Sequence, residues 1–314
     1  MKQNSGSKWV VIAALIGNGL IAITKFIAST ITGSSAMLSE AIHSVVDTGN
    51  QGLLLYGMKR ASKPADREHP FGYGMELYFW TFVVAIMIFA VGAGVSLYEG
   101  IHKLGDPQPI TKPMVNYVVL GIAMVFEGVA WMVAFREFQK QKGEMGYLRA
   151  VQRSKDPTVF TVLFEDSAAM LGLIAAFIGI YLAQTLDMPV FDAIASIVIG
   201  IILACTAAVL AYESKGLLIG ESANREVVDG IRNIVQQEDT IININEVLTM
   251  HMGPNDVLLN ISIDFKDAIT AGEVEKTISI LESSIKCEYP DIARIFIEAQ
   301  SRTGHLKNLT QERD

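Results

Sequence analysis

The chain has 314 residues, of which 51% are hydrophobic and only 18% are charged, and its mean hydropathy is positive. This composition is too apolar for an ordinary soluble protein of this size, so we expect part of the chain to lie in a lipid bilayer. The net charge of −8 arises largely after Tyr212, while lysine and arginine cluster in the apolar part, so we expect no nucleic-acid ligand. Cys205 and Cys287 show neither the spacing of a disulfide framework nor that of a thiolate metal site.

Six stretches are long and apolar enough to cross a bilayer as helices, which takes roughly 20 residues at about 1.5 Å each. They cover residues 9–31, 36–58, 77–101, 114–135, 159–183 and 189–212. The first stretch is too long for the apolar region of a cleaved signal peptide, so we expect a membrane helix there. The sequence therefore predicts an α-helical membrane protein whose residues 1–213 form six transmembrane helices.

Basic residues gather on one side of this arrangement. They follow the second stretch or lie between the fourth and the fifth: Lys59, Arg60, Lys63, Arg67, Arg136, Lys140, Lys142, Arg149, Arg153 and Lys155. The loops expected on the other side hold only Lys103 and Lys112. The positive-inside rule then predicts that both termini face the cytoplasm. Because no transit-peptide pattern precedes Trp9, we expect the bacterial inner membrane.

The pattern changes from Gly220 onward. An amphipathic helix at 224–237, alternating segments at 242–250 and 257–265, a second helix at 271–285 and a strand at 292–298 follow one another. This αββαβ order predicts a small α+β domain over residues 214–314, with one sheet covered by two helices. A segment of this size has a limited core, so support from a second copy is expected.

The second stretch carries the best candidates for a metal site. Residues 39–47 read SEAIHSVVD, in which Glu40, His43 and Asp47 are spaced three and four positions apart and therefore share one helix face. An imidazole and carboxylates at membrane depth suit Zn²⁺ and neighbouring divalent metals. A His–Asp hydrogen bond that only locks helix packing would produce the same spacing.

The fifth stretch adds Glu165 and Asp166 at membrane depth. Adjacent residues differ by about 100° around a helix, so one can face a site while the other pairs elsewhere; a neutral, hydrogen-bonded acid pair is the alternative. Glu127, near the centre of the fourth stretch, is a weaker candidate that a helix-to-helix hydrogen bond explains equally well. Lys25 in the first stretch either neutralises a nearby acid or extends outward.

His43, Asp47 and an acid from the fifth stretch would supply three or four nitrogen and oxygen ligands. Such a site suits tetrahedral zinc and rejects Mg²⁺ and Ca²⁺, which take six or more oxygens. Ligands bind metal in the deprotonated state, so protonation weakens binding and predicts exchange of metal for protons, with no resident cofactor. A metal-dependent membrane enzyme is the alternative, but no convincing nucleophile or oxyanion donor accompanies these residues.

These features resemble the cation diffusion facilitator family of metal efflux carriers. Residues 39–47 are similar to the HxxxD segment of its second span, residues 64–74 (PADREHPFGYG) to its signature loop, and residues 191–196 (FDAIAS) to the start of its sixth span. The resemblance implies a homodimeric metal/proton antiporter with a tetrahedral site between the second and fifth spans. It also implies a ferredoxin-like cytoplasmic domain that helps to hold the dimer.

Carried over residue by residue, His43, Asp47 and Asp166 match the family's ligand positions. The fourth position differs, because Val162 stands four residues before Asp166 and Glu165 is the nearest substitute. The segment LFEDSAA at 163–169 is similar to a divergent branch that includes mitochondrial zinc exporters. A site richer in oxygen makes manganese, iron and cobalt candidate substrates beside zinc.

The family's other metal positions are only partly present. In the signature loop Asp66 and His69 match, but Tyr73 stands where a third ligand is often histidine, and we favour a hydrogen-bonded loop anchor there. His251 and Cys287 do not reproduce the histidine-rich pattern of members that bind zinc in the C-terminal domain. We therefore expect that domain to dimerise without a full binuclear metal site.

Overall fold

A computed structural model describes residues 5–142 and 146–311 of the chain. It contains two compact units, which are described separately. The membrane unit comprises Met1–Arg60 and Glu76–Lys215, and the sheet unit comprises Ala61–Met75 and Gly216–Asp314. The loop after the second predicted span, residues 61–75, thus groups with the C-terminal segment. The predicted division at residue 213 had placed this loop in the membrane domain.

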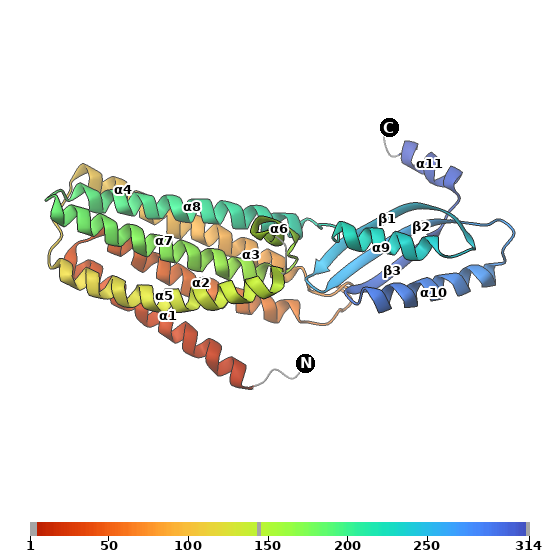
Figure 1. Ribbon diagram of the computed structural model, residues 1–314, viewed down its shortest axis with the longest axis horizontal. Coiled ribbons are helices and arrows are strands. Elements are labelled where there is room, and N and C mark those ends of the chain that lie inside the picture. Colours follow the sequence, from red (N-terminus) through yellow and green to blue (C-terminus); the bar gives the residue numbers. More distant parts are fainter. Residues whose placement is uncertain (1–4, 143–145, 312–314) are drawn as a thin grey trace. The chain divides into compact units, whose positions relative to one another are not determined.

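The membrane unit is a bundle of long helices (Figure 1). The helices are α1 (Ser5–Thr32), α2 (Ser35–Ala61), α3 (Glu76–Met87), α4 (Gly94–Gly105), α5 (Pro113–Lys142), the short α6 (Tyr147–Arg153), α7 (Pro157–Thr185) and α8 (Val190–Leu218). A π-helical segment, η1 (Ile88–Ala93), joins α3 to α4, so that Glu76–Gly105 forms one continuous helical rod. Each of the six predicted stretches coincides with one long helix or rod.

Four of these segments, among the described residues, are long and apolar enough to cross a membrane on that measure alone. They are Glu76–Gly105, Pro113–Lys140, Phe160–Thr185 and Val190–Leu218. The helix α2 is less apolar because serine, glutamate, histidine and aspartate side chains follow one another along it. The same polar residues that lower its hydropathy are the candidate ligands and their neighbours.

The turn between α1 and α2 is short because of its glycine. Gly33 has φ of +70°, a left-handed conformation that glycine adopts without steric cost.

Lys103, expected in a loop, lies instead in the last turn of α4, where its ammonium group is 2.8 Å from Asp192 Oδ2. The expectation was wrong because the third span continues to Gly105, beyond the predicted end at residue 101.

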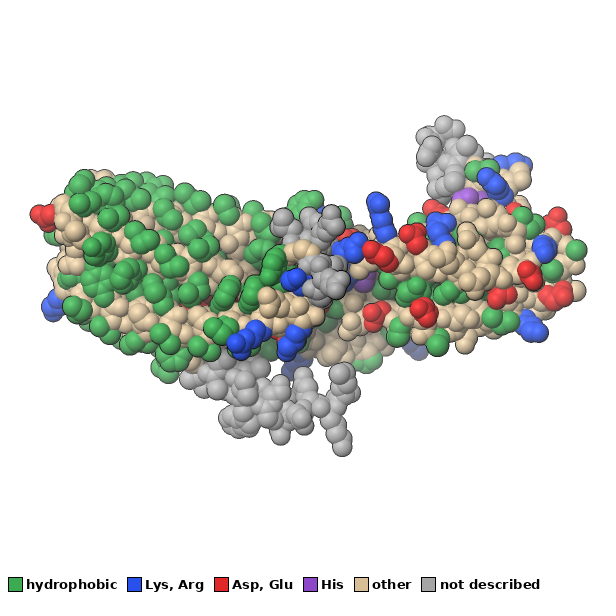
Figure 2. Space-filling model, viewed as in Figure 1, with side chains coloured by type: hydrophobic (Ala, Val, Ile, Leu, Met, Phe, Trp, Pro, Cys, Tyr) green, Lys and Arg blue, Asp and Glu red, His purple; other side chains and the backbone are tan. Residues whose placement is uncertain are grey.

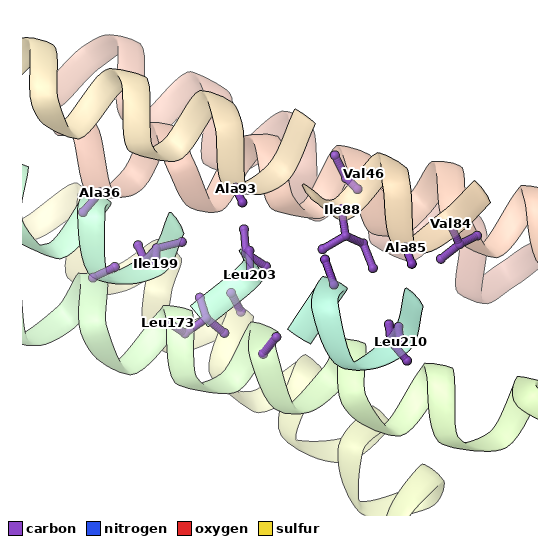
Figure 3. Packing of buried hydrophobic residues seen from close by; sticks show 14 of the residues in the cluster. Ala36, Val46, Val84, Ala85, Ile88, Ala93, Leu173, Ile199, Leu203 and Leu210 are labelled. Carbon is purple, nitrogen blue, oxygen red and sulfur yellow. The ribbon is translucent and has the colours of Figure 1, made fainter. Parts of the chain in front are cut away.

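The core of the membrane unit lies around α8. Figure 3 shows Ile199, Leu203 and Leu210 of α8 between residues of the Glu76–Gly105 rod and Leu173 of α7. Close approach of α8 to α4 is possible because Gly100 and Gly200 present no side chain, as is common between membrane helices. On the face that Figure 2 shows, hydrophobic side chains cover much of this unit, which suits contact with lipid.

The sheet unit has the predicted αββαβ order. It consists of α9 (Arg225–Gln236), β1 (Ile241–Gly253), β2 (Asp256–Phe265), α10 (Ala271–Glu288) and β3 (Ile292–Ala299), followed by α11 (Arg302–Gln311), which the sequence pattern did not predict. The sheet order is β1-β2-β3, with β1 antiparallel and β3 parallel to β2. Both α9 and α10 pack on the sheet, where their apolar residues meet those of β2 in one core.

Candidate metal site in the membrane helices

His43 and Asp47 lie one turn apart on α2, inside the membrane unit. The His43 side chain is 2% exposed and the Asp47 side chain 14%, so both have largely lost their contact with solvent. His43 Nδ1 and Asp47 Oδ1 are 3.3 Å apart but are not oriented for a hydrogen bond. Within the described part of the chain, these two atoms and His43 Nε2 have no hydrogen-bond partner. Buried polar atoms without partners are rare, and a bound ion is one explanation for them.

On α7, Glu165 and Asp166 lie in different surroundings. Glu165 is buried and accepts a hydrogen bond of 2.8 Å from Asn50 Nδ2 of α2, while Asp166 is half-buried. The charges of both α7 carboxylates act on Asp47. The α2 pair and the two α7 carboxylates thus lie in the same helix bundle, and the spacing on α2 accounts for the contact between His43 and Asp47.

Glu127 approaches the same interior from α5. It is half-buried, and its charge acts on Asp47 and on Asp166. The register of α5 against α7 is fixed one turn away, where Trp131 Nε1 donates to Ser167 Oγ at 2.9 Å. Glu127 is thus near the candidate ligands, on a helix that packs against α7.

Glu40 has a different role from its neighbours on α2. Its Oε2 atom is 3.0 Å from Lys25 Nζ of α1, and both side chains are completely buried. Lys25 therefore neutralises an acid instead of extending outward, one of the two alternatives that the sequence left open. A carboxylate engaged with a buried ammonium group is a poor ligand for a second cation.

The candidate ligands do not form a closed coordination shell. Across the described residues 5–142 and 146–311, no group of three histidine, cysteine, aspartate or glutamate side chains is close enough to hold a metal ion. The bundle brings His43 and Asp47 together and places Glu165, Asp166 and Glu127 nearby.

The signature loop is organised by hydrogen bonds within the sheet unit. Asp66 Oδ1 accepts from the backbone N–H groups of Glu68 and His69 at 3.0 and 2.8 Å, and Asp66 Oδ2 accepts from the Tyr73 hydroxyl at 2.8 Å. The His69 N–H bond, followed by that of Tyr73, holds the pKa of Asp66 below its ordinary value of 3.8. The His69 ring lies 4.2 Å from that of Tyr73. The Asp66 carboxylate is thus occupied in shaping the loop.

Two residues that the sequence analysis set aside as metal ligands, His251 and Cys287, lie in the same unit. His251 is buried on β1, with Nδ1 3.3 Å from the carbonyl oxygen of Gly253, and Cys287 is exposed on α10. Sequence reasoning did not single out Ser44, which accepts from Lys25, or Gly172, which lies against Glu40. Neither carries a signal of its own, because each acquires its role only from a partner on another helix.

Comparison with known proteins identifies the family. Residues 11–219 match the model described as the cation efflux transmembrane domain. The chain belongs to the cation diffusion facilitator family. The resemblance predicted from three motifs is therefore confirmed, as is the fold class of a helical membrane domain followed by a small α+β domain. The matched domain and the four apolar helices make the chain an integral membrane protein.

Relatives of this family member come from distant organisms. A proton-coupled mitochondrial zinc antiporter of Homo sapiens is 34% identical over 271 residues, which are 85% of this chain and 48% of that protein. Metal tolerance protein C4 of Arabidopsis thaliana is 28% identical over 261 residues, 82% of this chain and 57% of the plant protein. An uncharacterized transporter of Methanocaldococcus jannaschii is 22% identical over 266 residues, with 84% and 88% covered. The chain spans about half the length of the human and plant relatives.

Proposed function

We propose that this facilitator carries a divalent metal ion, zinc in the first place, across a membrane in exchange for protons. The observation that carries the proposal is the pair His43 and Asp47 on α2: both imidazole nitrogens and Asp47 Oδ1 are buried without a hydrogen-bond partner among the described residues, and the charges of the α7 carboxylates act on Asp47. Imidazole nitrogen and carboxylate oxygen are the ligands that zinc takes in proteins. The name of the human relative, a proton-coupled zinc antiporter, supports the same substrate pair.

In this proposal His43, Asp47 and Asp166 are ligands, and Glu165 or water completes the coordination. Protonation of the imidazole or of a carboxylate competes with the metal for the same lone pairs, so proton binding on one side of the membrane promotes metal release there. Alternating access of the site to the two sides then gives antiport. The absence of a histidine at Val162 leaves more oxygen in the ligand set, which keeps manganese, iron and cobalt as candidate substrates.

The decisive experiment uses the purified protein in sealed vesicles. Uptake of zinc, manganese, iron and cobalt is compared at several imposed pH gradients. We expect zinc uptake to follow the gradient, and the Asp47→Ala and Asp166→Ala variants to be inactive with every metal. Glu275→Ala, which removes an exposed carboxylate from α10, is the control and keeps wild-type uptake. Wild-type uptake by the Asp47 variant would remove that residue from the site.

Transport accounts for the site better than metal-dependent catalysis. The relatives include a named antiporter and a named transporter. We also propose that the protein is a homodimer and that both termini face the cytoplasm. The division of the chain into two domains at residue 213 is part of the same proposal. Residence in the bacterial inner membrane stays a prediction, since the human relative is named mitochondrial.

A further inference from the structure

A buried ion pair joins α1 to α2 beside the candidate site. Lys25 Nζ lies 3.0 Å from Glu40 Oε2 and donates to Ser44 Oγ at 2.8 Å, and neither charged side chain has any exposed surface. Lys25 is seven positions before Thr32, the last residue of α1, or about 10 Å from that end along the helix axis. An unpaired charge at that depth is costly, so the pair is expected to persist.

Glu40 lies close to the candidate ligands without being free to join them. It precedes His43 by three positions, and Ser44, the second acceptor of Lys25, follows His43 directly. The other carboxylate oxygen, Oε1, lies against Gly172 of α7, where an added Cβ would overlap it. This oxygen has no hydrogen-bond partner among the described residues. Glu40 thus extends to the helix that carries Glu165 and Asp166, and among the described residues its side chain bonds to Lys25, which is itself held by Ser44.

The positive charge of Lys25 extends its influence beyond Glu40. It acts electrostatically on His43 and Asp47 of α2 and on Glu127 of α5. Several carboxylates lie in this interior, and each additional free one would strengthen the attraction for a divalent cation. A carrier must also release its ion, so tighter binding slows its turnover.

We propose that Lys25 is a positioning residue that sets the affinity of the metal site: its ammonium group holds Glu40 out of the ligand set and offsets part of the negative charge that a divalent ion meets at His43 and Asp47. The inference rests on the proposed function, because it concerns the same ion. Lys25 acts as a fixed counter-charge, and the Lys25–Glu40 pair sets the affinity of the site at a value from which the ion can leave.

The test measures the KM and the turnover rate for zinc in proteoliposomes that contain the full-length protein. The variants are K25Q, E40Q and the double variant K25Q/E40Q, in which the amide retains hydrogen bonding without charge. K25Q leaves an unbalanced carboxylate beside the site, so we expect its KM to fall about tenfold and its turnover to slow. E40Q leaves an unbalanced ammonium group, so its KM should rise by a similar factor. The double variant should return to the wild-type KM.

Opposite shifts in KM distinguish this role from a merely structural one. If the pair only supports helix packing, less of each single variant will fold, and the folded K25Q and E40Q proteins will have similar KM values for zinc. That result would overturn the inference. If K25Q does not fold, E40Q and the double variant test the inference, because KM must rise in E40Q and return to the wild-type value in the double variant.

K103Q, which breaks a buried ion pair next to the α1–α2 turn, is the matched control and should lower stability with unchanged KM. A wild-type protein that moves no zinc would instead refute the proposed function.

Discussion

Lys103 of α4 donates a hydrogen bond to Asp192 of α8 at 2.8 Å, and both side chains are buried inside the membrane unit. Asp192 also accepts from the Ser34 hydroxyl at 2.5 Å and from the Ser35 backbone N–H at 2.7 Å, while Lys103 donates to the Gly33 carbonyl oxygen. One carboxylate thus caps the start of α2, whose first N–H groups lack partners within the helix. It fixes the end of the helix that carries His43, about 12 Å away along the axis.

Asp192→Ala should destabilise the membrane unit by about 3–5 kcal/mol, because it leaves a buried ammonium group unpaired and removes the cap of α2. Thermal unfolding in detergent measures the loss. The double variant Asp192→Asn, Lys103→Gln should recover part of it, because no unpaired charge is then left behind. Unfolding of Asp192→Ala at the wild-type temperature would show that the network contributes nothing to stability.

The amino-acid sequence predicted the helices and the shared face of His43 and Asp47 on α2, because both depend on periodicity along one element. Apolar length located the spans, and the spacing of His43 and Asp47 placed them on one face. The pairings Lys25–Glu40, Asn50–Glu165 and Lys103–Asp192 were not predicted. They join residues 15, 115 and 89 positions apart, and a single sequence does not indicate which helices are neighbours.

Glu165→Gln should impair zinc transport less than Asp166→Asn. One oxygen of Glu165 already accepts from Asn50, and glutamine keeps an oxygen that can accept the same hydrogen bond. Asp166 makes no side-chain hydrogen bond with another described residue, so we expect its replacement to weaken metal binding directly. Zinc KM and turnover in vesicles are measured for both variants, with Asn50→Ala as a companion that frees Glu165. A greater loss for Glu165→Gln would make Glu165 a ligand and Asp166 its neighbour.

Val162→His should increase the preference for zinc over manganese by roughly tenfold, since it restores an imidazole one turn before Asp166 and nitrogen ligands favour zinc over manganese. The readout is the ratio of kcat/KM for the two metals in the same vesicles. Leu163→His is the matched control, because position 163 points about 100° away around α7 and its ratio should not change. Equal ratios in the wild type and in Val162→His would place this helix face outside the site.

The first turn of α10 in the sheet unit should lose protection as the pH falls. The Thr270 N–H donates to Glu273 Oε2 at 2.7 Å, and the Glu273 N–H donates to Thr270 Oγ1 at 3.3 Å, which forms a capping box. The bonds from the Thr270 backbone and hydroxyl hold the pKa of Glu273 below its ordinary value of 4.5. Because the folded-state pKa is lowered, this stabilisation is present above the unfolded-state pKa and disappears as the pH falls through the folded-state value.

Amide hydrogen exchange of the full-length protein, corrected for the intrinsic pH dependence of exchange, measures this effect. Glu273→Gln keeps the reciprocal hydrogen bond but has no titrating group, so protection of the first turn of α10 should be weaker and independent of pH below about 4.5. The first turn of α9 is the internal reference, because the side chain of its N-cap residue, Asn224, makes no capping bond. Both helices lie in the same unit, so a loss of protection that appeared equally in α9 would come from the unit as a whole and not from Glu273.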